Sequence, residues 1–140
     1  MTHAKLSLSL KNELAELDQL SASLKEFGAT IGLPPKILFN VNLALEELIC
    51  NIITHGYPEN GSHQIELSIE YRDHTLTIFL EDDGIPFNPL HARCANRTCI
   101  LKKRQIGGLG VQIARSMMDD IGYQRCGTKN RLILKKFITP

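Results

Sequence analysis

The sequence has no tryptophan, few other aromatic residues and only four cysteines among its 140 residues. The cysteines form no CxxC pair and are too sparse for a disulfide scaffold, so we expect a reducing, cytoplasmic environment. No apolar run approaches the roughly 20 residues that a membrane-spanning helix requires. The N-terminal residues also contain no unbroken apolar core of a secretory signal. We therefore expect neither a membrane protein nor a secreted one.

Neither sign of charge dominates, because 16 basic residues stand against 15 acidic ones and the net charge is +1. This balance removes the strongest argument for direct binding of nucleic acid. Hydrophobic residues at 43% and charged residues at 22% are typical of a folded globular chain. Together with the length and the absence of a linker-like segment, they predict a single domain over residues 1–140.

Hydrophobic periodicity predicts about five strands and three helices. Alternation of apolar and polar residues indicates strands at residues 6–10, 65–71, 76–80, 122–126 and 131–138. Helical spacing indicates helices at about residues 13–31, 35–55 and 111–121, the first of them capped by Asn12. Because neighbouring strands arrive as hairpins, we predict an α+β fold. It would be a two-layer sandwich with a largely antiparallel sheet and the helices on one face.

The helix predicted at residues 35–55 carries polar side chains that amphipathicity does not explain. Glu47, Asn51 and His55 recur every fourth residue and therefore lie on one helix face. This face is either a solvated edge with a Glu–Asn pair or a binding site. In a site, Asn51 would offer its amide oxygen to a hard cation and Glu47 would accept a proton.

Two other motifs are weak when each is taken alone. The first, Asp82-Asp83-Gly84, directly follows a predicted strand and is either a turn or a carboxylate site for an amino group. The second, Gly107-Gly108-Leu109-Gly110, opens the third predicted helix and is either a hinge or a phosphate site. Residues 83–110, which join the two motifs, show no periodicity, and a loop of this length is typical of a functional lid.

In combination the motifs are far more specific. Glu47-x-x-x-Asn51, Asp82-x-Gly84-x-Pro86 and the glycine motif at 107–110 resemble the N, G1 and G2 boxes of GHKL ATPases. The segments ALEELICNIITHGY and DDGIPFNP…GGLGVQIARSMMDDIGY are similar to the anti-sigma factor serine kinases of the RsbW/SpoIIAB type. The resemblance covers about residues 5–138 and implies the Bergerat ATP-binding fold.

The resemblance implies a role for each motif residue. Asn51 would coordinate Mg²⁺ on the ATP phosphates, Asp82 would accept the adenine amino group, and residues 87–106 would form the ATP lid. Glu47 would be the catalytic carboxylate that orients or deprotonates a serine hydroxyl. The residues expected to bind the cofactor are Asn51, Asp82, Gly84, Pro86, Lys103, Arg104, Gly107, Gly108, Leu109 and Gly110.

The implied function is a Mg-ATP-dependent protein serine kinase that acts as an anti-sigma factor. Its expected partners are a sigma factor, a STAS-type anti-anti-sigma protein and a second copy of the chain. The alternative is an ATP-gated binding module of the same fold without kinase activity. The catalytic domain of a sensor histidine kinase is disfavoured, because the first predicted helix contains no histidine. A zinc site at His91, Cys94 and Cys99 is disfavoured as well, because a fourth ligand is missing.

Overall fold

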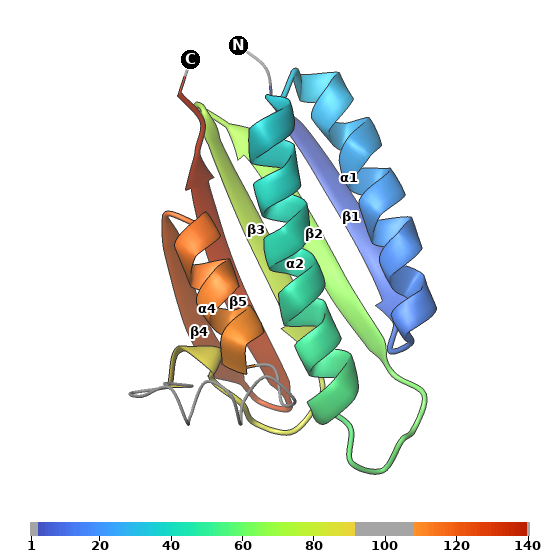
Figure 1. Ribbon diagram of the computed structural model, residues 1–140. Coiled ribbons are helices and arrows are strands. Elements are labelled where there is room, and N and C mark those ends of the chain that lie inside the picture. Colours follow the sequence, from blue (N-terminus) through green and yellow to red (C-terminus); the bar gives the residue numbers. More distant parts are fainter. Residues whose placement is uncertain (1–2, 92–107, 140) are drawn as a thin grey trace.

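The computed structural model describes residues 3–91 and 108–139, and its centre is one five-stranded sheet (Figure 1). The strands run in the spatial order β1-β2-β3-β5-β4, and every neighbouring pair is antiparallel. Their bounds are β1 (Ala4–Lys11), β2 (Gln64–Arg72), β3 (Thr75–Asp82), β4 (Asp120–Cys126) and β5 (Lys129–Phe137). The predicted antiparallel sheet and both predicted hairpins are therefore confirmed.

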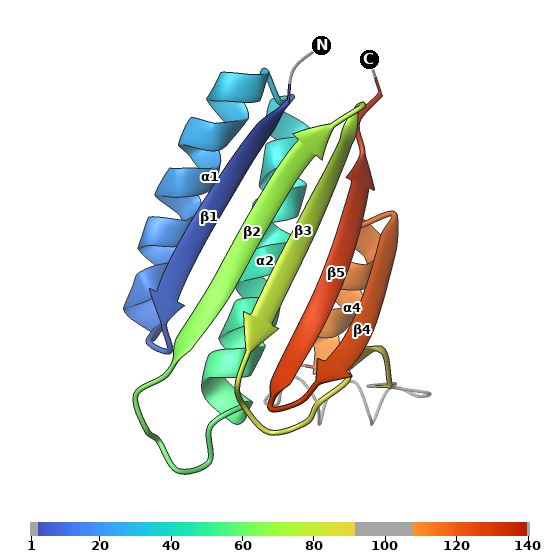
Figure 2. The same ribbon diagram turned by 180° about the vertical axis from the view of Figure 1, so that it is seen from behind.

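The three helices of the described chain lie on the same face of this sheet, and Figure 2 shows the other face without helices. They are α1 (Leu17–Ile31), α2 (Pro35–His55) and α4 (Gly108–Met117), accompanied by the short 3₁₀ turns η1 (Leu14–Glu16) and η2 (Pro89–His91). Helix α1 ends at Gly32, whose φ of 69° lies in the left-handed region that glycine adopts without strain. The α+β sandwich expected from the sequence is thus the observed fold.

Helix α2 is the central core helix of the domain. Its length and its mean hydropathy of 1.5 are sufficient by themselves for a membrane span. However, Val41, Leu45 and Leu48 are at most 2% exposed and pack within the core cluster against the sheet. The apolar composition of α2 is therefore explained by its burial between α1, α4 and the sheet.

Two local predictions are wrong. Asn12 does not cap a helix, because its amide donates to the carbonyl of Gly61 and accepts from the backbone N–H of His63, which ties β1 to the loop before β2. The last helix ends at Met117 rather than near Ile121, because the chain enters β4 and Ile121 pairs with Leu134 of β5. In both cases a contact distant in sequence overrides the local pattern.

The fold gathers four chain segments at one end of the domain, opposite the termini (Figure 1). These are the C-terminal ends of α2 and β3, the N-terminal end of α4 and the turn between β4 and β5. The described residues of each of the three sequence motifs belong to one of these segments. The topology therefore concentrates the predicted functional residues in one region.

Candidate functional site

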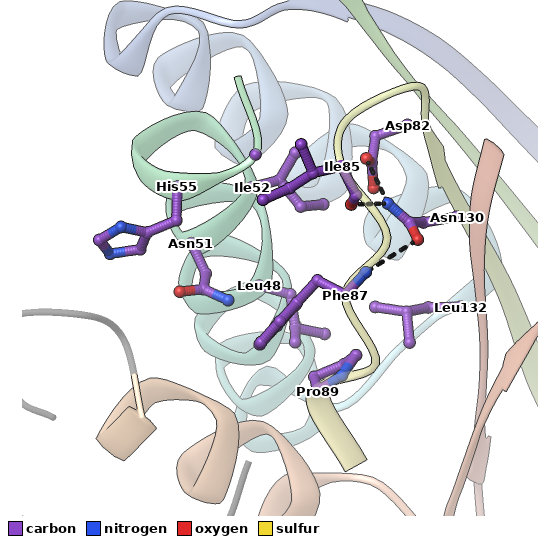
Figure 3. Close-up of a pocket in the computed structure, with 11 residues that line it drawn as sticks. Leu48, Asn51, Ile52, His55, Asp82, Ile85, Phe87, Pro89, Asn130 and Leu132 are labelled. Atoms are coloured by element: carbon purple, nitrogen blue, oxygen red, sulfur yellow. Dashed lines mark hydrogen bonds between the residues drawn. The ribbon is translucent and has the colours of Figure 1, made fainter. Parts of the chain in front are cut away.

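A pocket of about 600 Å³, open to solvent, lies at this end of the domain (Figure 3). Most of its lining is apolar, and the polar groups come from three separate elements. The lining residues are Leu48, Asn51, Ile52, His55 and Gly56 at the end of α2, Asp82 of β3, Ile85, Phe87 and Pro89 of the following loop, and Asn130 and Leu132 of β5. An apolar slot with a few fixed polar groups is typical of a small-molecule site.

Asp82 is the charged group of the pocket and is only 5% exposed. Its Oδ1 accepts hydrogen bonds from the backbone N–H of Gly84 at 2.9 Å and from Nδ2 of Asn130 at 3.0 Å. Burial raises the pKa of Asp82, while these two hydrogen bonds oppose that rise. The side chain is therefore a buried acceptor held by donors, which suits recognition of an amino group.

Gly84 stands where the loop after β3 passes closest to the end of α2. The N–H of Ile85 donates to the carbonyl of Gly56 at 3.0 Å, and Arg125 Nη1 donates to the Gly84 carbonyl at 3.0 Å. A Cβ atom on Gly84 would lie 2.6 Å from the Gly56 oxygen and 2.9 Å from Asp82 Oδ1. Only glycine allows this approach without displacing backbone.

We therefore expect Gly84→Ala to disturb both the fold and the pocket. The forced shift should lower the free energy of unfolding by about 1–3 kcal/mol, the usual cost of overpacking, and should displace the Asp82 carboxylate. Urea denaturation measures the first effect. Gly122→Ala in β4 is the matched control, because a Cβ there meets nothing within 4 Å. Equal stabilities of the two variants would contradict the steric argument.

Asn51 and Glu47 lie one helical turn apart on α2, as predicted. Asn51 is 7% exposed, and its buried Oδ1 has no hydrogen-bond partner among the described residues. A buried amide oxygen without a partner costs free energy unless a ligand satisfies it, and amide oxygens are ligands for Mg²⁺. Glu47 is half-buried, makes no hydrogen bond or ion pair with other described residues and is not part of the pocket lining. Exposed His55 lies at the pocket rim.

Gly108, Leu109 and Gly110 form the first turn of α4, whose N-terminus lies at the same end of the domain as the pocket (Figure 1). A helix N-terminus presents free N–H groups and a partial positive charge, both of which favour an anion. Pro86 is exposed in the loop after β3. Lys103, Arg104, Gly107, Cys94 and Cys99 lie outside the described residues, as does most of the predicted lid.

A second polar cluster joins the loop after α2 to the end of β3. The His63 ring stacks on Tyr57 with 4.3 Å between the ring centroids, and its two nitrogens bond the carboxylates of Asp83 and Glu59. The hydrogen bond to Asp83 and then the one to Glu59 raise the pKa of His63 above its ordinary value of 6.5. The protonated ring thus links two carboxylates beside the pocket.

We expect this cluster to make stability depend on pH in a defined direction. Because the pKa of His63 is raised by folding, the added stability is fully present below pH 6.5 and is lost as the pH rises through the folded value. Unfolding by urea at pH 6 and pH 8 measures the difference. His63→Phe keeps an aromatic ring on Tyr57 but cannot be charged, so its pH difference should be smaller. An unchanged difference would remove His63 as the cause.

Asn130 is a site residue that the sequence did not reveal. It is 5% exposed, stands directly opposite Asp82 in the pairing of β3 with β5, and contacts the pocket loop (Figure 3). In the sequence it appears as the last residue of a polar turn, Gly127-Thr128-Lys129-Asn130, where asparagine is common. Only the register between strands that are distant in sequence places it beside Asp82.

The chain is similar in sequence to several characterised proteins. The chain is 25% identical over 105 residues to the serine/threonine-protein kinase BtrW of Bordetella bronchiseptica, covering 75% of this chain and 74% of that one. It is 28% identical over 86 residues to the anti-sigma F factor of Bacillus velezensis, covering 60% of this chain and 58% of that one. It is also 30% identical over 101 residues to the anti-sigma F factor of Clostridium kluyveri, covering 71% and 70%.

The fold is also found in solved structures. The structure of the RsbU and RsbW domains of a Mycobacterium tuberculosis protein matches with a TM-score of 0.70 at 16% identity, covering 98% of this chain and 33% of that one. A histidine kinase domain from Erythrobacter litoralis matches with a TM-score of 0.56 at 16% identity, covering 89% and 60%. The family described as histidine kinase-like ATPase domain matches residues 10–136, nearly the whole sequence. The chain therefore belongs to the histidine kinase-like ATPase family.

Proposed function

We propose that the protein is a Mg-ATP-dependent protein serine kinase that acts as an anti-sigma factor. It would phosphorylate a STAS-type anti-anti-sigma protein and sequester a sigma factor. It would act in the cytoplasm and as a homodimer. The observation that carries the ATP site is the buried, unpartnered oxygen of Asn51 in the same pocket as the buried carboxylate of Asp82. The relatives named anti-sigma F factor and serine/threonine-protein kinase support the biological role.

Different residues of the pocket would bind different parts of ATP. Asp82 would accept a hydrogen bond from the amino group of adenine. The apolar side chains of Ile52, Ile85 and Leu132 would contact the flat base. Asn51 would hold Mg²⁺, which would supply positive charge beside the phosphates. The first turn of α4 then offers backbone N–H groups to the phosphate oxygens.

Glu47 is the proposed catalytic residue. Phosphoryl transfer requires a positioned hydroxyl more than it requires covalent chemistry by the enzyme. Glu47 stands one turn from Asn51, and within the described chain no hydrogen bond or ion pair occupies its carboxylate. It is thus available to orient the attacking serine and to take its proton.

Transfer of label from γ-labelled ATP into a soluble lysate of the source organism tests the kinase. With Mg²⁺ present, we expect one small, acid-stable labelled protein that appears with the wild type only and is identified as a STAS protein. The same lysate incubated with the Glu47→Gln variant measures the labelling that is caused by other kinases in the lysate. If ATP binds but a purified STAS partner from the same organism also remains unlabelled, the kinase is refuted and the ATP-gated binding module takes its place.

A further inference from the structure

We propose that Asn130 is the residue that positions Asp82 and the loop after β3 for recognition of the nucleotide base. This inference rests on the proposed ATP site and adds to it a determinant of base specificity. The position of Asn130 opposite Asp82 in the β3–β5 register brings the two buried polar side chains together (Figure 3).

The side chain of Asn130 uses its full hydrogen-bonding capacity inside the protein. Its Nδ2 donates to Asp82 Oδ1 at 3.0 Å and to the Ile85 carbonyl at 2.8 Å. Its Oδ1 accepts from the backbone N–H of Phe87 at 3.2 Å and from the Tyr123 hydroxyl. A side-chain amide has two N–H donors and two acceptor lone pairs, so none is left for a ligand. Asn130 is therefore a positioning residue that does not itself contact the base.

These bonds determine which oxygen of Asp82 faces the ligand. Oδ1 accepts from both Gly84 N–H and Asn130 Nδ2, whereas Oδ2 has no hydrogen bond within the described chain. Rotation of the carboxylate would break two bonds in a buried environment, where they are stronger than in water. Oδ2 is thus the acceptor presented to an exocyclic amino group, as adenine has and hypoxanthine lacks.

The same side chain also holds the pocket wall. Ile85 and Phe87 are 47% and 43% exposed, so burial of their own side chains does little to fix the loop. Their backbone groups are instead tied to Asn130 on one side, and Ile85 N–H is tied to Gly56 on the other. A loop that is ordered before binding saves the entropy cost of ordering it on the ligand.

A comparison of ATP with inosine triphosphate, which carries an oxygen in place of the amino group, tests this role. Calorimetric titrations with Mg²⁺ should show that the wild type prefers ATP. In Asn130→Leu, the ratio of ATP affinity to inosine triphosphate affinity should fall by about tenfold or more, the effect of losing one hydrogen bond to a charged group. Both affinities should also fall by a common factor, because the loop is no longer held before binding. Asn130→Ala, which removes the side-chain amide without adding a second carboxyl group beside Asp82, should show the same loss of preference. It also replaces Asn130→Leu if that variant does not fold.

Leu134→Val, on the same face of β5 but outside the pocket, controls for simple destabilisation and should keep the wild-type preference. A wild type that prefers ATP, together with Asn130 variants that keep the full preference, would overturn the role of Asn130 and leave the ATP site intact. A wild type that binds neither nucleotide would overturn the proposed function, and the role of Asn130 with it.

Discussion

Replacement of Asn51 by leucine is expected to abolish Mg-dependent ATP binding while making the fold more stable. The buried Oδ1 of Asn51 has no partner among the described residues, so leucine removes an unsatisfied polar atom and should raise the free energy of unfolding by roughly 1 kcal/mol. The same change removes the proposed Mg²⁺ ligand. Affinity for Mg-ATP should fall by at least about 100-fold. Loss of a residue that only hydrogen-bonds a metal ligand can already cost up to about this factor, so loss of the ligand itself should cost no less.

The opposite signs of the two effects make this test sharp. Asn42→Leu on the same helix is the matched control, because the Asn42 side chain is satisfied by Glu46 and Ser21. It should lose stability and keep Mg-ATP affinity. Urea denaturation and calorimetric titration with Mg-ATP measure both properties of both variants. Normal Mg-ATP affinity in Asn51→Leu would remove Asn51 from the metal site.

The second large effect is expected for Glu47→Gln. The amide keeps the size of the carboxylate but cannot accept the serine proton, so phosphoryl transfer should fall by about 10²–10⁴-fold, the usual contribution of a general base. ATP affinity should be unchanged, because Glu47 does not line the pocket. The rate of label transfer to the purified protein substrate and the heat of ATP binding measure the two separately.

The neighbouring Glu46→Gln is the control for this variant. The carboxylate of Glu46 accepts from Asn42 and Ser21, which connects it to the packing of α2 against α1. It should therefore transfer phosphate at the wild-type rate. Equal rates for Glu47→Gln and wild type would exclude Glu47 as the base, and equal losses in both glutamate variants would indicate a general effect of charge on α2.

Local patterns in the sequence were enough to predict the sheet, the three helices and the grouping of the polar residues on α2. The spacing of four residues already places Glu47 and Asn51 on one face, because helix geometry is local. The position of Asp82 at the end of a strand is equally local, since alternation along β3 ends there. These features need no knowledge of which strands pair.

The missed features all depend on contacts between distant segments. Asn130 reaches Asp82 only through the pairing of β3 with β5, and the sequence offers a turn as the simpler interpretation. His63 meets Asp83 because the loop after α2 folds back on the end of β3. Asn12, which resembles a helix cap, instead bonds that same loop. A polar residue next to a turn is thus ambiguous until strand register is known.

Calorimetric titration of Mg-ATP into the wild-type protein is the decisive experiment, because every step of the proposed mechanism requires an ATP site in this pocket. We expect saturable binding of one ATP per chain, with a Kd below about 1 mM, the upper end of the usual range for enzyme substrates. The binding should be lost when Mg²⁺ is removed by a chelator. Absence of saturable binding would contradict the roles assigned to both Asp82 and Asn51. Binding of equal affinity with and without Mg²⁺ would contradict the role assigned to Asn51.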